Sequence, residues 1–232
     1  LELNHDQHDK WFLHIDTFDP HEPWDPPKWY ADLYDPDWKG GDVPGIAYVN
    51  TLKESPSEPR MMSTSRKSEL SDDEMNHIRA LYAGEVTLVD RWVGKLLQKI
   101  GDLGLLENTM VIFTTDHGSY HGEHDYLHKR AHLYEEVAHI PLLMRLPDEM
   151  GDIRGRCNAL VQPPDLMPTI LDFAGAKIPE TIQGESLSPI IRREKNQVRE
   201  VTISSQSFLR GFLSLQASSR LTVLNLLLII KQ

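Results

Sequence analysis

A long amphipathic segment followed by a short apolar one constrains the fold of this chain more than any other feature. In residues 72–100, apolar side chains recur every three or four positions, which predicts a helix with one buried face. Ser71 and Glu74 form the pattern of a capping box at its start. Residues 109–115 (TMVIFTT) form a near-continuous apolar run, typical of a strand covered on both faces. This succession indicates an α/β architecture.

Further segments extend the pattern. Residues 11–16 (WFLHID) and 140–146 (IPLLMRL) are predicted to be strands, and residues 165–174 (DLMPTILDFA) a short helix closed by Gly175. Together they predict an α/β fold with a largely parallel central sheet flanked by helices. Residues 221–230 (LTVLNLLLII) are too few to span a bilayer, so we expect a buried strand or helix there and no transmembrane segment.

Composition excludes several classes of protein. The net charge of -11 argues against a nucleic-acid-binding domain, which needs a basic face to displace counterions from phosphates. The single Cys can form neither an internal disulfide nor a Cys-type zinc site. Six of the eleven His residues fall within residues 117–139, and composition alone leaves open whether they do chemistry or form a solvated face.

Asp116-His117-Gly118 directly follows the predicted strand at residues 109–115. In α/β sheets, ligands bind beyond the carboxyl ends of strands, so this carboxylate and imidazole are well placed to hold a cation. Taken alone, the tripeptide fits a simple turn after a strand at least as well.

Several ordered motifs add to this tripeptide. The motifs are residues 18–24 (FDPHEPW), 116–124 (DHGSYHGEH), 128–130 (HKR), 134–142 (YEEVAHIPL) and 165–175 (DLMPTILDFAG). In this order, over about residues 11–192, they resemble the sulfatase family of the alkaline-phosphatase superfamily. The resemblance implies hydrolysis of a sulfate monoester, with a small-molecule or sugar sulfate ester as substrate.

The resemblance also implies roles for individual residues. Asp116 and His117 would ligate the active-site metal. Lys129 would bind a sulfate oxygen and offset charge in the transition state. His21 would hydrogen-bond the sulfate or the leaving-group oxygen and assist its departure as an acid. Around them we expect a substrate pocket lined by His121, His124, Arg130 and His132. Arg130 is also the second choice for the role of Lys129, because counting back from Tyr134 favours it.

The metal and the chemistry leave alternatives open. Ca2+ is the expected cofactor by family, but an imidazole ligand at His117 is softer than an all-oxygen set and would also suit Mn2+ or Zn2+. A phosphonate monoester or phosphodiester hydrolase of the same superfamily is the first alternative function. A non-catalytic, sulfatase-derived binding domain is the second.

The nucleophile motif of the family is missing from this chain. Sulfatases carry a Cys-x-Pro/Ala-x-Arg segment near their N-terminus, whereas Cys157 lies in Gly-Arg-Cys-Asn-Ala. We therefore expect residues 1–195 to be a partial sulfatase-type catalytic domain that begins after this segment, and residues 196–232 to be an atypical C-terminal tail. The isolated chain is predicted to be inactive on aryl sulfates.

Overall fold

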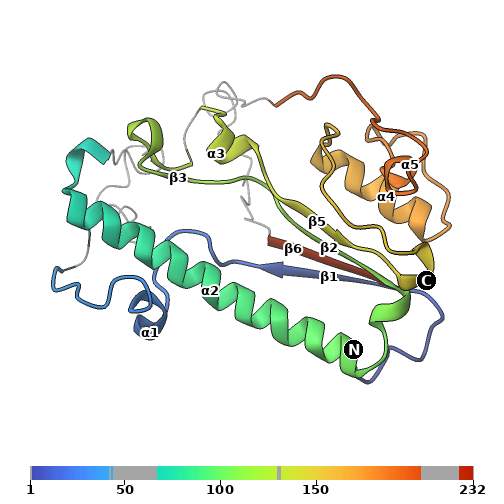
Figure 1. The fold of residues 1–232 in the computed structure, drawn as a ribbon, viewed down its shortest axis with the longest axis horizontal. Coiled ribbons are helices and arrows are strands. Elements are labelled where there is room, and N and C mark those ends of the chain that lie inside the picture. The colour runs from blue at the N-terminus through green and yellow to red at the C-terminus, as the bar shows by residue number, and fades with distance from the viewer. Residues whose placement is uncertain (1, 42, 44–66, 130–131, 205–224, 232) are drawn as a thin grey trace, which may run out of the picture.

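The computed structural model describes residues 2–41, 43, 67–129, 132–204 and 225–231 (Figure 1). Short 3-10 turns connect several of its elements. In chain order, the strands and α-helices are β1 (Trp11–Thr17), α1 (Lys28–Ala31), α2 (Asp72–Asp102), β2 (Thr109–Thr115), β3 (Tyr120–His121), β4 (Leu127–His128), α3 (Glu135–Ala138), β5 (Leu142–Arg145), α4 (Leu166–Phe173), α5 (Ser188–Ile191) and β6 (Asn225–Lys231).

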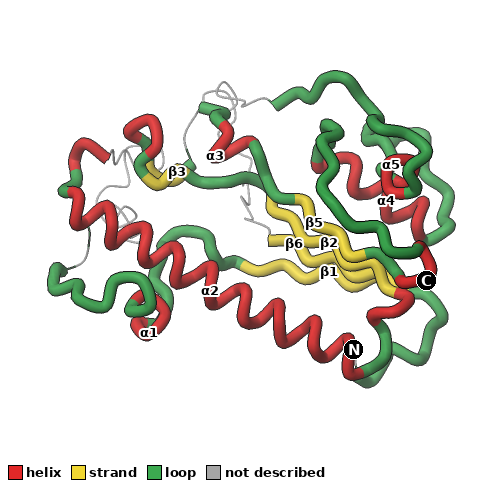
Figure 2. Tube along the Cα trace, viewed as in Figure 1, coloured by secondary structure: helices red, strands yellow, loops and turns green. Residues whose placement is uncertain are grey.

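The main sheet has four strands in the order β1-β6-β2-β5 (Figure 2). Its three pairings, β1 with β6, β6 with β2 and β2 with β5, are all antiparallel. The prediction of a largely parallel sheet is therefore not confirmed in the described part of the chain. The physical reason is the position of β6: β1 and β2 run in the same direction, as a strand–helix–strand unit requires, but β6 lies between them and pairs with both.

Helices cover both faces of this sheet (Figure 1). Val111 and Phe113 of β2 pack with Ile100 of α2 on one face. Met110 and Ile112 point to the opposite face, where they pack with α4. The alternation follows from the period of two in a strand, and it explains why β2 is apolar on both sides. The α/β class is thus confirmed, with α2, the sheet and α4 as three layers.

The helix α2 begins where the sequence predicts. Ser71 is its N-cap, and the capping box with Glu74 is formed, with the Glu74 backbone N–H donating to Ser71 Oγ at 3.2 Å. Its first turns pack in a cluster that includes Met75 and Ile78, and its last turns pack on the sheet. This helix of 31 residues therefore runs from the core of the sheet to the loops that follow the carboxyl ends of β1 and β2.

Two of these loops form the end of the molecule where the predicted site lies. The hairpin of β3 and β4 pairs Tyr120 with His128, and its strands follow the turn at the end of β2. Leu127 of β4 packs on the first turns of α2 together with Trp24, from the loop after β1. Packing on α2 thus brings the segment after β1 and the segment after β2 to the same place.

A buried carboxylate organises the region around α4. Asp165 has no exposed surface and accepts hydrogen bonds from the backbone N–H groups of Gln162 at 2.7 Å and Glu185 at 2.8 Å. Arg199 forms a bidentate ion pair with the same carboxylate. Three segments distant in the sequence are thereby held by one side chain.

No helix in the described residues is both long enough and apolar enough to cross a bilayer.

Candidate active site

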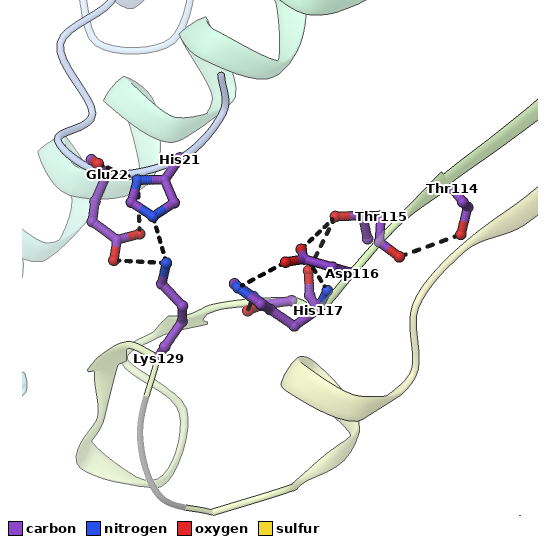
Figure 3. A network of polar contacts seen from close by, with 8 residues as sticks. His21, Glu22, Thr114, Thr115, Asp116, His117 and Lys129 are labelled. Carbon is purple, nitrogen blue, oxygen red and sulfur yellow. Dashed lines mark hydrogen bonds and ion pairs between the residues drawn. The ribbon is translucent and has the colours of Figure 1, made fainter. Parts of the chain in front are cut away.

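The polypeptide bends at Asp116, directly after β2, and His117 follows (Figure 3). Asp116 Oδ1 accepts a hydrogen bond from the His117 backbone N–H at 2.9 Å. The other carboxylate oxygen, Oδ2, lies 3.6 Å from His117 Nε2. Both side chains are partly exposed, with 24% of His117 and 32% of Asp116 accessible.

The hydrogen bonds of His117 define its ring chemistry. Nδ1 lies 2.8 Å from the carbonyl oxygen of Gly118, which can only accept, so Nδ1 carries the proton. In the neutral ring Nε2 therefore presents a lone pair, and it is buried without a hydrogen-bond partner among the described residues. A lone pair facing the carboxylate of Asp116 is an arrangement that a cation between them would stabilise.

Asp116 and His117 alone would make an incomplete site for a cation. Across the described ranges, no three His, Cys, Asp or Glu side chains come close enough together to hold a metal ion. Asp116 and His117 offer one oxygen and one nitrogen ligand, which fits a divalent metal in donor type but supplies only two ligands.

A second polar cluster brings the loop after β1 to the hairpin (Figure 3). Lys129 Nζ lies 2.5 Å from His21 Nε2 and 3.3 Å from Glu22 Oε1. His21 Nδ1 contacts the backbone carbonyl oxygen of Glu22, and it lies 3.8 Å from Glu22 Oε2. The three side chains are largely buried, with 6% of His21, 6% of Glu22 and 13% of Lys129 exposed.

These contacts determine which ring nitrogen of His21 carries the proton. Because Nδ1 donates to the Glu22 carbonyl, Nε2 accepts from the Lys129 ammonium. Burial lowers the pKa of His21, and the nearby Lys129 charge lowers it further, although Glu22 acts in the opposite sense. The imidazole is therefore neutral at neutral pH.

The loop that carries His21 is held by its own hydrogen bonds and by α2. The His21 backbone N–H donates to the Phe18 carbonyl at 3.0 Å, and Trp24 Nε1 donates to the Pro20 carbonyl at 3.1 Å. Glu85 of α2, only 2% exposed, accepts from the Asp25 backbone N–H at 3.0 Å. A buried side chain of the long helix thus supports the loop that presents His21.

The remaining candidate residues lie in aromatic contacts. His121 packs against Tyr82 of α2 and against Trp24, with ring centroids 4.1 and 4.7 Å apart. His124 stacks on Tyr134 at 3.9 Å. His132 stacks on Tyr126, with ring centroids 5.1 Å apart, and its carbonyl accepts from Tyr120. Arg130 lies outside the described residues, so its predicted place in the pocket stays a prediction.

Burial of His121 gives a prediction for acid stability. Burial lowers the pKa of His121 from 6.5 to about 4, so below pH 6.5 the unfolded chain takes up the proton first. Its contribution to the free energy of unfolding is complete above pH 6.5 and is lost as pH falls to about 4, by up to about 3 kcal/mol. His121→Phe keeps the ring contacts, and we expect a flatter pH profile in urea unfolding.

The control for this measurement is His139→Gln, at a largely exposed histidine. It should keep the acid sensitivity of the wild-type chain. Equal pH profiles for His121→Phe and the wild-type chain would contradict the prediction.

Position 118, directly after the predicted metal ligands, has no room for a side chain. The Gly118 backbone N–H donates to the Val137 carbonyl at 2.9 Å, and a Cβ on Gly118 would overlap the carbonyl oxygen of Glu136. Gly118 is not among the glycines with positive φ. The requirement for glycine at this position therefore comes from the close approach of α3.

Fold and site together define a class: an α/β domain with a carboxylate and an imidazole after its central strand and a buried Lys–His contact beside them. The sulfatase family model matches residues 1–176, and the chain therefore belongs to the sulfatase family.

Named relatives agree with this membership. An arylsulfatase of Clostridium perfringens is 29% identical over 202 residues, which cover 85% of this chain and 40% of that protein. An N-acetylglucosamine-6-O-sulfatase of Bacteroides thetaiotaomicron is 38% identical over 113 residues, covering 49% of this chain and 20% of that protein. The chain thus spans less than half the length of these relatives.

A solved structure supports the fold. The phosphonate monoester hydrolase of Silicibacter pomeroyi superposes with a TM-score of 0.56 at 29% identity. The match covers 75% of this chain and 36% of that one.

Two polar residues at the site were missed by the sequence reasoning. Glu22 contacts Lys129, and Glu85 supports the His21 loop. A signal for Glu22 exists in the sequence, since an acidic residue between His21 and Pro23 sits inside the recognised motif. For Glu85 the only signal is a charged residue one position before Val86 in the apolar stripe.

Proposed function

We propose that this chain forms the sulfate-binding part of a sulfatase active site, which hydrolyses sulfate monoesters. The observation that carries the proposal is the approach of three separate segments. His21 comes from the loop after β1, Asp116 and His117 from the turn after β2, and Lys129 from the end of the β3–β4 hairpin (Figure 3). A buried cation, an imidazole and a metal half-site suit an anionic ester whose charge grows on the leaving oxygen.

Asp116 and His117 are the proposed metal ligands, and Ca2+ is the proposed metal. Sulfatases are metal-dependent, and the unpartnered Nε2 of His117 beside the Asp116 carboxylate fits a cation. A nitrogen ligand also suits Mn2+ or Zn2+. When bound, the metal would supply electrostatic stabilisation of the anionic oxygens.

Lys129 and His21 are proposed to act on the ester itself. The Lys129 ammonium would bind a sulfate oxygen and offset negative charge, which is most effective in a largely buried position. His21 would hydrogen-bond the leaving-group oxygen through Nε2. Because Nε2 accepts from Lys129, His21 has to gain a proton from solvent before it can donate one.

The proposed substrate is an aryl or sugar sulfate ester. The two sulfatase relatives are named as an arylsulfatase and an N-acetylglucosamine-6-O-sulfatase. One name refers to an aryl sulfate and the other to a sugar sulfate. Residues around His124 and His132 are the proposed lining of the pocket, since both present aromatic stacks beside the hairpin.

Hydrolysis of phosphonate monoesters is the second candidate, favoured by the superposition on the Silicibacter enzyme. Rates on 4-nitrophenyl sulfate and 4-nitrophenyl phenylphosphonate separate the two candidates. They are measured in a form of the protein that includes a Cys-x-Pro-x-Arg segment. A faster rate on the sulfate supports the proposal, and a faster rate on the phosphonate overturns it.

The metal half-site gives a prediction for Ca2+ binding. With two protein ligands, this chain should bind Ca2+ with a Kd of roughly 1 mM, in the range of the weaker protein sites. Asp116→Ala should weaken binding at least about tenfold, because a charged ligand contributes more than a neutral one. Isothermal titration calorimetry measures both values.

Asp148→Ala serves as the matched control, because it removes a carboxylate that pairs with Arg145 at an exposed position. Its Kd should equal that of the wild-type chain. Equal loss in both variants would place the bound Ca2+ elsewhere.

A further inference from the structure

Glu22 occupies a position that an anionic substrate would be expected to use. Its side chain is 6% exposed, and Oε1 lies 3.3 Å from Lys129 Nζ. Oε2 lies 3.8 Å from His21 Nδ1. The carboxylate therefore reaches both residues that are proposed to handle the sulfate group.

The charges of this cluster cancel. Lys129 carries one positive charge, Glu22 one negative charge, and His21 is neutral because its pKa is lowered by burial. A buried ammonium without a counter-ion is strongly unfavourable, so the Glu22 carboxylate stabilises Lys129 in this position. The same carboxylate repels every anion that approaches Lys129.

This repulsion depends on the charge of the anion. Coulomb energy is proportional to each charge, so a dianion is repelled by Glu22 and attracted by Lys129 twice as strongly as a monoanion at the same distances. Because the two charges cancel, a dianion gains little attraction at this site to offset its larger desolvation cost. A sulfate monoester is a monoanion, whereas free sulfate and a phosphate monoester at high pH are dianions. Close to a buried carboxylate, this difference is only partly screened by salt.

We propose that Glu22 is a specificity-determining residue that makes the Lys129 site accept monoanionic esters and disfavour dianions. The inference rests on the proposed sulfate-binding role of Lys129 and adds a charge rule to it. Its consequence is that the sulfate dianion released by hydrolysis is held weakly, and that phosphate monoesters are poor ligands.

The geometry argues against a purely structural role for the side chain. The backbone carbonyl of Glu22 already binds His21 Nδ1, so the ring would be oriented by any residue at this position. The carboxylate adds its contact to Lys129 and its charge. A neutral side chain of the same shape could still contact Lys129 but would remove its counter-ion.

Binding of two small anions to this chain tests the proposal. Inorganic sulfate is the dianion and methyl sulfate the monoanion, each titrated calorimetrically at pH 7.5 and at equal ionic strength, with EDTA present. In the wild-type chain, we expect sulfate to bind no more tightly than methyl sulfate. Lys129→Ala should remove the binding of both.

Glu22→Gln should strengthen the binding of both anions, but unequally. We expect about a fivefold gain for methyl sulfate and about a 25-fold gain for sulfate, because the energy doubles with the charge. Glu22→Asp keeps the charge and should retain the wild-type ratio. Asp32→Asn is the matched control, since it removes the carboxylate of another lysine pair, with Lys28, at an exposed position.

Failure of the charge rule and failure of the proposed Lys129 site give different results. An unchanged ratio of the two affinities in Glu22→Gln, or weaker binding of both anions, overturns the charge rule while the Lys129 site stands. Sulfate binding the wild-type chain more tightly than methyl sulfate overturns it without any variant. Binding that is undetectable, or that survives in Lys129→Ala, overturns the proposed site and the charge rule together.

Discussion

Asp165→Ala is expected to lower the free energy of unfolding by about 3–5 kcal/mol, the cost of breaking a buried ion pair from one side. Asp165 has no exposed surface, and its removal leaves Arg199 without its bidentate partner. The backbone N–H groups of Gln162 and Glu185 lose their acceptor as well. Urea unfolding followed by circular dichroism measures the difference.

The control is Asp152→Ala, which breaks an exposed ion pair with Arg154 and should cost no more than about 1 kcal/mol. A similarly small loss for Asp165→Ala would show that the region around α4 does not depend on this carboxylate.

The same carboxylate has a pH signature. Burial acts to raise the pKa of Asp165, but the hydrogen bonds from Arg199 and from the two backbone N–H groups outweigh burial and lower it below 3.8. Its contribution to stability is therefore present above the ordinary aspartate pKa and is lost as pH falls through the lowered value. At pH values well below the lowered pKa, Asp165→Ala and the wild-type chain should differ much less than at pH 7.

Glu85→Gln is expected to stabilise the chain at pH 9, by up to about 4 kcal/mol. Burial, together with the negative charges of Asp19 and Asp25, raises the pKa of Glu85 from 4.5 to about 8, although the hydrogen bond from the Asp25 backbone N–H acts in the opposite sense. The folded chain therefore holds a proton that the unfolded chain has released, so the wild-type chain loses stability as pH rises from 4.5 through 8. Glutamine is neutral at every pH and can still accept from the Asp25 backbone N–H.

The measurement is the difference in the free energy of unfolding between the two chains from pH 4 to pH 9. The difference should be close to zero near pH 4 and should grow between pH 4.5 and 8. Glu107→Gln, at an exposed glutamate, should show no such growth. A pH-independent difference for Glu85→Gln would mean that the carboxyl is not protonated in the folded chain.

Local patterns in the sequence predicted the individual elements well. The capping box at Ser71, the apolar run of β2 and the helix before Gly175 are all found where their residues place them. Each depends on hydrogen bonds and side-chain periods within a few residues, which a single sequence carries in full.

Strand neighbours could not be predicted in this way. Residues 221–230 gave an apolar run consistent with a strand or a helix, and nothing in it specifies a partner or a direction. The placement of β6 between β1 and β2 depends on packing between segments at least 110 residues apart in the sequence, and the expected parallel sheet is not confirmed for the described strands.

The sequence also predicted only part of the candidate site. The motif resemblance selected His21 and Lys129, which the structure places in contact although 108 positions separate them. The roles of both residues stay predictions. Glu22 and Glu85 escaped because a charged residue in a loop or a helix is usually solvated, and only the three-dimensional structure reveals that these two are buried.

Close contact between Gly118 and α3 has a mechanical consequence. The backbone of Gly118 rests directly against the carbonyl of Glu136, and its N–H is bonded to Val137 one residue further on. With no side chain between them, α3 packs backbone to backbone against the segment that carries Asp116 and His117. This four-residue helix therefore bears directly on the backbone of the proposed metal ligands.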